Sequence, residues 1–245
     1  WEPAAVYHHL EWLEIEAGRH GIPVHRVSAG NIREDALNFQ VRGRQDGGRR
    51  WASMPYFTKT DGPGKGGQIR RQCTGEYKIQ PIERFIRREL LGFQPGERAP
   101  IGSVEQWFGI SADEVRRARM SQVSWKVHFY PLIGLPGPII EKPFTRDRCM
   151  AWLAEHYPER HVPRSACLGC PYHSKNEWKN LKINDPRGWG DVVEFDRAIR
   201  TCAGMRDEMF LHSDRIPLDK VDLRSAEDFG QQNLWNTECE GMCGV

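Results

Sequence analysis

The apolar residues near the start of the chain recur at helical spacing. They follow a proline at position 3, which suits the first turn of a helix. The positions on this face are Val6, Leu10, Leu13 and Ala17. A Gly-Ile-Pro sequence at 21–23 ends the pattern. The spacing predicts a first helix here, then a short strand over residues 22–27 and a second helix over residues 31–40.

Similar patterns continue through the rest of the chain. An apolar face predicts a helix over residues 76–91, which Gly92 ends. Its apolar positions are Ile79, Ile82, Ile86 and Leu90. Strands are predicted at 106–110 and 125–130, and further helices at 145–156, 177–183 and 188–202. The sequence Ser-Ala-Asp-Glu at 111–114 fits a capping box at a helix start.

Strands that alternate with helices predict an α/β fold, with a sheet layered by helices. The second half has more helices and loops, so we expect an α/β region over residues 1–140 and a helical, cysteine-containing region over 141–245, packed on the first. A chain of 245 residues with 39% hydrophobic and 28% charged residues is not disordered, collagen-like or a coiled coil. No apolar run reaches the ~18–20 residues of a membrane helix, and no signal peptide opens the chain. We therefore expect no membrane partner and a cytoplasmic location.

Positive charge is concentrated in one glycine-rich stretch. Residues 41–71 contain eight basic and two acidic residues, a net charge of +6 in a chain whose total is +2, which leaves −4 elsewhere. Such a local excess favours a phosphate-bearing partner. The aromatic residues Trp51, Tyr56 and Phe57 lie in the same stretch, so it could also bind nucleic acid by backbone contacts and base stacking.

The seven cysteines include two close pairs, Cys167/Cys170 and Cys239/Cys243. A Cys-x-x-Cys loop brings two sulfurs together, and thiolates bind zinc or iron–sulfur clusters. The loop would need further ligands, and it could instead be a redox dithiol. The candidates for the further ligands are Cys73, Cys239, Cys243 and His173. The terminal pair could supply either a last ligand or a nucleophilic thiol.

Cationic residues flank two predicted helix starts. Arg70 and Arg71 precede the helix that follows Cys73, where backbone amides and positive charge together would bind an anion and favour a thiolate. Ser111 and Arg116 follow a predicted strand, where open α/β sheets place their ligands. A solvated charged turn is the more common outcome for the first pattern, and a plain helix cap explains the second at least as well.

Together these motifs resemble the phosphoadenosine phosphosulfate (PAPS) reductases and their relatives. Cys73 with Lys78 and Pro81-Ile82 resembles the family's Cys-x4-Lys-x2-Pro-Leu signature. The loop from Cys167 is similar to the second half of the iron–sulfur motif in the adenylylsulfate branch, and Glu-Cys at 238–239 resembles the ending that carries the nucleophile. The nearest likeness is to a phage and bacterial group with a Cys-x-Gly-Cys-Pro-x-His loop and a Cys-Glu-Gly-Met-Cys-Gly ending.

This resemblance implies a doubly wound, mostly parallel sheet of the adenine nucleotide α-hydrolase type. It implies an adenine nucleotide substrate, either ATP or a sulfonucleotide (PAPS or adenosine phosphosulfate), and a 4Fe-4S cluster, with zinc as the alternative. The family's first strand and phosphate loop would precede residue 1 and are missing from this sequence. Adenylylsulfate reductases have two adjacent cysteines where this chain has Gln72-Cys73, so a tail cysteine would complete the ligand set.

The implied site residues fall into three groups. The cluster ligands are Cys73, Cys167, Cys170 and Cys243, and the nucleophile is Cys239. The groups that bind phosphate or sulfate are Arg70, Arg71, Lys78, Ser111 and Arg116.

Three functions remain open at this stage. The first is reduction of a sulfonucleotide with a thiol electron donor, or ATP-dependent activation with sulfur transfer. The second is a thiolating ATP pyrophosphatase that acts on nucleic acid through the basic stretch at 41–71. The third is a zinc-stabilised binding module without catalytic activity.

Overall fold

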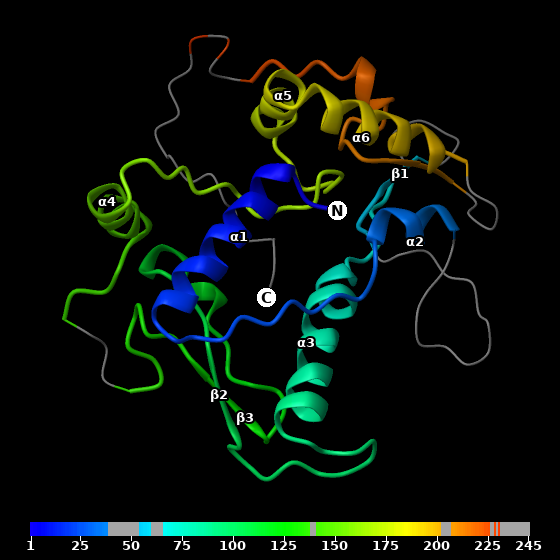
Figure 1. The fold of residues 1–245 in the computed structure, drawn as a ribbon. Coiled ribbons are helices and arrows are strands. Elements are labelled where there is room, and N and C mark those ends of the chain that lie inside the picture. Colours follow the sequence, from blue (N-terminus) through cyan, green and yellow to red (C-terminus); the bar gives the residue numbers. More distant parts are fainter. Residues whose placement is uncertain are drawn as a thin grey trace. The chain divides into compact units, whose positions relative to one another are not determined.

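Helices and short strands form over most of the segments where periodicity predicts them (Figure 1). The computed structural model describes residues 1–38, 54–59, 66–137, 141–201 and 207–225, and also Asp228 and Gly230. Most of the basic stretch at 41–71 lies outside these ranges. Three cysteines lie outside them as well: Cys202, Cys239 and Cys243.

The first two helices are confirmed, and the strand predicted between them is wrong. Helix α1 spans Ala4–Arg19 and helix α2 spans Ile32–Asn38. Residues 22–31 pair with no strand among the described residues. The side chains of Ile22 and Val24 are exposed, so this segment has neither a sheet partner nor a core to bury it.

The helix predicted over residues 76–91 is confirmed as a continuous helical run over residues 73–90. It consists of η1 (Gly75–Ile79), α3 (Gln80–Phe85) and η2 (Ile86–Leu90), where both η segments are π-helical. Gly92, with φ +71°, follows its end in the left-handed region. Its predicted apolar face is not buried, because the exposed fractions of Ile79, Ile82 and Leu90 are 38%, 39% and 53%.

The chain folds into two compact units. The first consists of Trp1–Ile82 and Pro163–Gly244, and the second of Glu83–Val162. The boundary expected at 140/141 falls inside the second unit. The cysteine loop shares a unit with the N-terminal helices because residues from both parts of this unit, between Ile32 and Leu223, contribute to one core.

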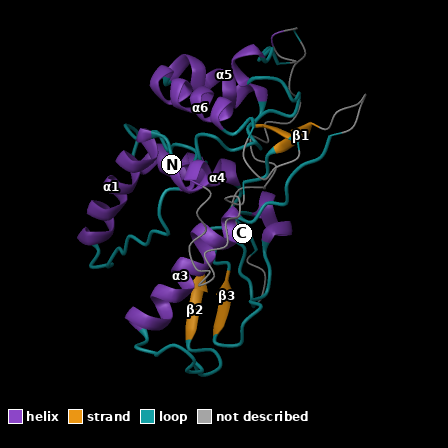
Figure 2. Ribbon diagram, turned by 90° about the vertical axis from the view of Figure 1, so that its right-hand side faces the viewer, coloured by secondary structure: helices purple, strands orange, loops and turns teal. Residues whose placement is uncertain are grey.

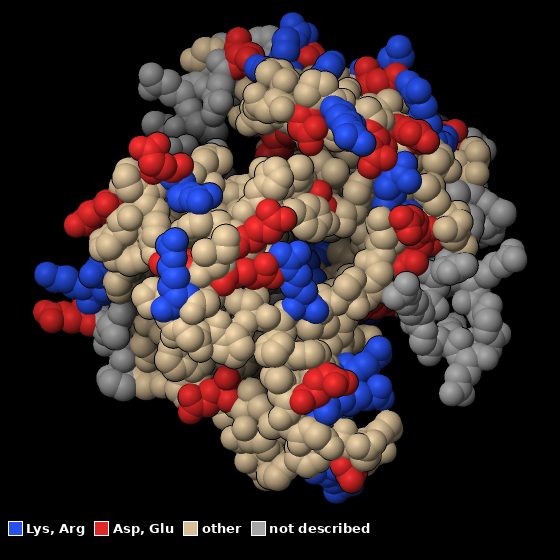
Figure 3. Space-filling model, in the orientation of Figure 1, with Lys and Arg blue, Asp and Glu red and all other residues tan. Residues whose placement is uncertain are grey.

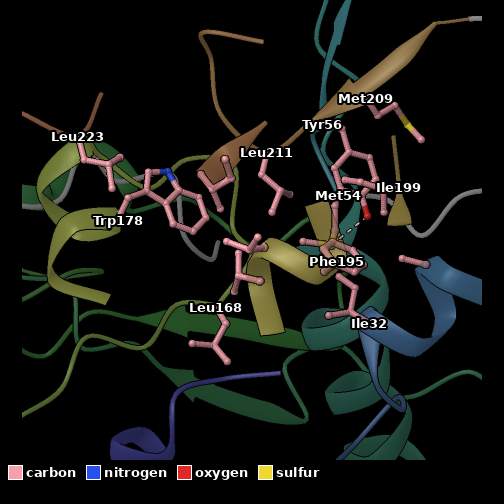
Figure 4. Packing of buried hydrophobic residues seen from close by; sticks show 14 residues of the cluster. Ile32, Met54, Tyr56, Leu168, Trp178, Phe195, Ile199, Met209, Leu211 and Leu223 are labelled. Atoms are coloured by element: carbon pink, nitrogen blue, oxygen red, sulfur yellow. Dashed lines mark hydrogen bonds between the residues drawn. The ribbon is translucent and has the colours of Figure 1, made fainter. Parts of the chain in front are cut away.

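The core of the first unit gathers residues from several distant segments (Figure 4). Helices α5 (Lys175–Asn184) and α6 (Pro186–Ala198) pack together, and β1 (Phe57–Lys59) pairs antiparallel with β4 (Glu208–Phe210). The Tyr56 hydroxyl donates to Met54 Sδ at 3.3 Å, the bond drawn in Figure 4. The buried members are Ile32, Ala36, Met54, Tyr56, Leu168, Trp178, Val192, Val193, Phe195, Ile199, Met209, Leu211, Leu218 and Leu223.

Side-chain caps fix where α5 and α6 begin. Ser174 accepts from the backbone of Glu177, and the Glu177 carboxylate accepts from the Ser174 backbone, which completes a capping box at α5. Asp185 accepts from Gly188 N at 2.8 Å at the start of α6, where Pro186 occupies the first turn. These caps place α6 directly after α5, so that both helices cover the same core.

The second unit contains a parallel strand pair (Figure 2). Strand β2 (Val104–Trp107) pairs with β3 (Lys126–Phe129), which confirms the strands predicted near these positions. The 3-10 helix η3 (Ala112–Arg117) lies between them in sequence, and helix α4 (Arg146–His156) follows with Thr145 as its cap. The capping box predicted at Ser111 is wrong, because that side chain makes no cap hydrogen bond.

The fold is therefore mixed helix and strand with small sheets, one of them parallel, which is compatible with an α/β class. Where the chain is described, no helix is both long and apolar enough to cross a membrane.

Candidate functional site

The Cys-x-x-Cys loop forms two successive turns in the first unit. Cys170 N donates to Cys167 O at 3.0 Å, and His173 N donates to Cys170 O at 3.1 Å. The cysteines at 167 and 170 are free thiols. Leu168 and Gly169, in the middle of the turn, are buried against the core. Cys167 and Cys170, at its two ends, are only partly buried and lie at the margin of the core.

Trp1 covers this turn. Leu168 N donates to Trp1 O at 3.0 Å, which ties the two backbones together. The Trp1 indole N–H donates to Asp191 Oδ2 at 2.7 Å, and its ring meets Phe195 edge-on with centroids 4.7 Å apart. A Cβ at Gly169 would overlap the Trp1 ring, so only glycine leaves room for this cover.

Gly169→Ala is expected to lower the free energy of unfolding by about 1–3 kcal/mol, because the added methyl must displace the Trp1 ring. Gly190→Ala is the matched control. Gly190 lies exposed in α6 with open space around it, so alanine there should stabilise by about 0.5–1 kcal/mol. Denaturant unfolding of both variants measures the difference, and equal effects would contradict the packing described for Gly169.

The Cys167 sulfur lies among charged groups. Its S–H donates to Glu2 Oε1 at 3.9 Å. Burial and then the Glu2 carboxylate raise the pKa of the Cys167 thiol to about 11, while the Lys78 ammonium opposes them. The charge of Cys73 adds to the rise. Cys73 and Lys78, which lie about ninety residues earlier in the chain, are thus brought into electrostatic range of Cys167.

Cys73 lies at the start of the long helix, half-buried against the same hydrophobic cluster as Cys167. Beside it, Arg71 donates from Nη2 to Thr74 Oγ1 at 2.5 Å, and its guanidinium lies 6.0 Å from the centre of the Tyr172 ring. The remaining predicted cations of this unit, Arg70 and Lys78, are exposed. The cysteine site therefore combines thiols with a cationic border.

His173 has a buried ring next to the cysteine turn. Its centroid lies 4.6 Å from that of Trp178, and both ring nitrogens are buried. Burial, with the Arg164 charge as the next cause, lowers the pKa of His173 to about 4, while an interaction with the Cys167 backbone opposes that shift. The ring is therefore neutral at neutral pH, as a metal ligand or a packed core histidine would be.

The second unit holds the other two predicted phosphate-binding residues. The Ser111 hydroxyl donates to Asp113 Oδ2 at 3.3 Å, and Asp113 also accepts from Arg146 N at 2.6 Å. Arg116 is exposed on η3. The remaining predicted phosphate-binding residues lie in the first unit: Arg70, Arg71 and Lys78. The predicted phosphate-binding residues are thus divided between the two units. At the start of α4, the backbone N–H of Arg146 is already bonded to the Asp113 carboxylate.

The structure describes only some of the metal ligands predicted from sequence. Cys73, Cys167 and Cys170 belong to one unit, but Cys243 and the nucleophile Cys239 lie outside the described residues. Within the described ranges, no group of three or more His, Cys, Asp or Glu side chains is gathered closely enough for a metal ion.

Sequence reasoning missed two groups at this site, Glu2 and Trp1. Both approach the loop from more than 160 residues away, and no local pattern marks them.

Charge on the molecular surface is mixed. On the face shown in Figure 3, basic and acidic side chains are interspersed among the described residues. The predicted basic stretch lies mostly outside those residues, so its role in binding stays a prediction. No protein-family model, curated protein or solved structure matches this chain.

Proposed function

We propose that this chain is a PAPS-reductase-like enzyme that acts on an adenine nucleotide and carries a thiolate-bound metal centre. The centre is a 4Fe-4S cluster held by Cys73, Cys167, Cys170 and the tail Cys243, and the fold is the doubly wound sheet of that family. The parallel pairing of β2 with β3 supports the fold. One observation carries the assignment of ligands: Cys73 and Cys167, distant in sequence, contact the same hydrophobic cluster of the first unit.

The donor set suits a thiolate-bound metal. Two cysteines lie on a backbone-bonded turn at the margin of the core, and Cys73 contacts the same core cluster from the start of the long helix. The three sulfurs are not gathered as a metal site in the described structure, so metal binding would have to draw them together. A buried thiol such as Cys167 needs a positive partner before it ionises, and a metal provides one. When bound, the cluster would supply electron-transfer capacity.

The chain's own residues would bind and orient the nucleotide. Lys78 lies in electrostatic range of Cys167, Arg71 lies beside Tyr172 of the loop, and Arg70 precedes Arg71 in the chain, and such positive charge suits a phosphate or sulfate group. Arg71 is partly fixed by Thr74 and Tyr172, so its guanidinium is preorganised. Cys239 is the proposed nucleophile, which attacks the sulfur of a sulfonucleotide while the adenosine phosphate leaves.

Cys239→Ser is expected to abolish turnover and leave nucleotide affinity near that of the wild type, because the serine hydroxyl keeps the shape but is a far weaker nucleophile. Turnover is measured as sulfite released from adenosine phosphosulfate or PAPS with a thiol donor, and as pyrophosphate released from ATP. Calorimetry with each nucleotide gives the affinity.

Cys149→Ser is the matched control, since Cys149 lies in α4 of the second unit, whereas Cys73, Cys167 and Cys170 belong to the first. It should keep wild-type turnover. Unchanged turnover in Cys239→Ser would remove the nucleophile assignment, and the absence of binding by all three nucleotides would overturn the substrate class.

A further inference from the structure

The cysteine turn brings two thiols close enough along the backbone for a disulfide. Cys170 N donates to Cys167 O at 3.0 Å, and both residues are in the thiol form. A turn closed by such a bond between residues i and i+3 brings their Cα atoms within about 7 Å of each other. Disulfides join cysteines whose Cα atoms lie about 4.4–6.8 Å apart. A bridge between Cys167 and Cys170 therefore requires rotation of two side chains and little movement of the backbone.

Contacts with Trp1 fix this turn in place. Leu168 N donates to Trp1 O at 3.0 Å, and Gly169 packs against the Trp1 ring. Both cysteines of the turn are partly exposed. Because the turn is already ordered, closing a bridge within it costs little further conformational entropy. The intramolecular bridge is thereby favoured over separate bonds from each cysteine to a small thiol.

The Glu2 carboxylate stabilises the reduced form of the pair. Its Oε1 accepts the S–H hydrogen of Cys167, with sulfur and oxygen 3.9 Å apart. A disulfide sulfur carries no hydrogen, so oxidation removes this bond from a partly buried carboxylate. Burial and then the same carboxylate raise the pKa of the Cys167 thiol to about 11. Cys167 is therefore a protonated thiol at neutral pH.

We propose that Cys167 and Cys170 are a reversible dithiol–disulfide pair, which exchanges with small disulfides such as oxidised glutathione. The Cys170 thiolate attacks first, because Cys167 is held as a thiol beside Glu2. The S–S bond of oxidised glutathione breaks, a mixed disulfide forms at Cys170, and one glutathione thiolate leaves. Cys167 then loses its proton to solvent and attacks the Cys170 sulfur, which releases the second glutathione. The two cysteines are oxidised by two electrons, and one oxidised glutathione is reduced to two thiols.

The test places the full chain at neutral pH in mixtures of reduced and oxidised glutathione with EDTA. Acid quenching, alkylation, trypsin digestion and mass spectrometry then locate the disulfides. Residues 165–175 form one tryptic peptide that contains both cysteines. We expect a bridge within this peptide that forms in oxidised glutathione and opens in dithiothreitol. A peptide that stays unbridged in oxidised glutathione, or that pairs with another cysteine of the chain, overturns the proposal.

Cys167→Ser tests the order of the two steps. Cys170 should retain glutathione as a mixed disulfide in this variant, because the second thiol that would displace it is missing. Cys170→Ser should take up glutathione more slowly at the remaining Cys167, whose proton is held beside Glu2. Equal rates of uptake in the two variants would contradict the first attack by Cys170.

Glu2→Gln tests the part of the carboxylate. The amide keeps the size of the side chain but accepts the S–H hydrogen more weakly, so the reduced form loses part of its advantage. The equilibrium constant for oxidation by glutathione should rise about fivefold. Glu11→Gln is the matched control, because it removes an exposed carboxylate of α1, and it should keep the wild-type constant. Equal constants in both variants, at equal melting temperature, overturn the role given to Glu2.

Metal analysis of the same samples separates this proposal from the proposed function, on which it does not rest. A disulfide leaves neither sulfur as a thiolate ligand, so the pair and the cluster are alternative states of the same cysteines. A chain that holds no metal and forms the bridge supports the pair and overturns the cluster. A metal that remains in EDTA and keeps both cysteines unreactive towards oxidised glutathione overturns the pair and leaves the cluster intact.

Discussion

Asp196→Ala should be the most damaging single substitution in the core of the first unit, with a loss of about 3–5 kcal/mol of unfolding free energy. Asp196 is 1% exposed. Its two carboxylate oxygens accept from Leu211 N at 3.0 Å and Leu218 N at 3.1 Å, and Arg200, just beyond the end of α6, also donates to it. Alanine would leave two buried N–H groups and a half-buried guanidinium without their acceptor, each at a cost of about 1–3 kcal/mol.

Asp196→Asn tests the same hydrogen bonds with a smaller chemical change. An amide keeps one acceptor oxygen and presents an NH2 group to the other backbone N–H, so its loss should fall between those of the wild type and the alanine variant. Burial raises the pKa of Asp196, while the backbone donors and Arg200 oppose that rise. The hydrogen bonds to Asp196 therefore oppose the effect of burial on its pKa.

Asp222→Ala is the control for Asp196→Ala. Asp222 is exposed and pairs with Arg224, so its removal should change stability little. Chemical denaturation followed by tryptophan fluorescence measures all three variants. Equal losses in Asp196→Ala and Asp222→Ala would contradict the role given to the Asp196 carboxylate.

Most helices and strands could be predicted because the pattern of apolar residues that indicates each one lies within its own residues. Helix α1 follows from apolar spacing after Pro3, and β2 and β3 follow from alternation. The prediction of a strand over 22–27 was wrong because a strand needs a partner strand. The apolar side chains of residues 22–27 do not indicate whether such a partner exists elsewhere in the chain. The cap predicted at Ser111 failed because that hydroxyl is taken by Asp113, whereas Ser174 and Glu177 form the true capping box.

Of the residues at the candidate site, the cysteines could be predicted from the sequence, whereas Glu2 and Trp1 could not. Spacing marked Cys167 and Cys170 and left Cys73 among four candidates for the further ligands, and the resemblance then favoured Cys73, which shares their unit. Glu2, Trp1 and Asp196 act through contacts with residues distant in the chain, and these contacts depend on how the core closes. Tertiary packing likewise decides which helix faces are buried, which is why the apolar face with Ile79 and Leu90 is exposed although its spacing suggests a core.

Loss of the metal centre is the second large expected effect. Cys73→Ser and Cys167→Ser should each remove most of the bound metal, because an alcohol oxygen replaces a thiolate in a set that has no spare ligand. Cys149→Ser should retain the wild-type amount, since Cys149 lies on α4 of the second unit. Melting temperatures of the three variants show whether a loss of metal is more than a failure to fold.

The central claim is that these cysteines hold an iron–sulfur centre. Iron, zinc and sulfide analysis with an absorption spectrum, on wild-type and Cys73→Ser protein purified without oxygen, tests it most directly. We predict several irons per wild-type chain, matching sulfide and a broad band near roughly 400 nm, all of them lost in Cys73→Ser. A wild-type protein without iron, or a Cys73→Ser variant with the wild-type spectrum, would contradict it.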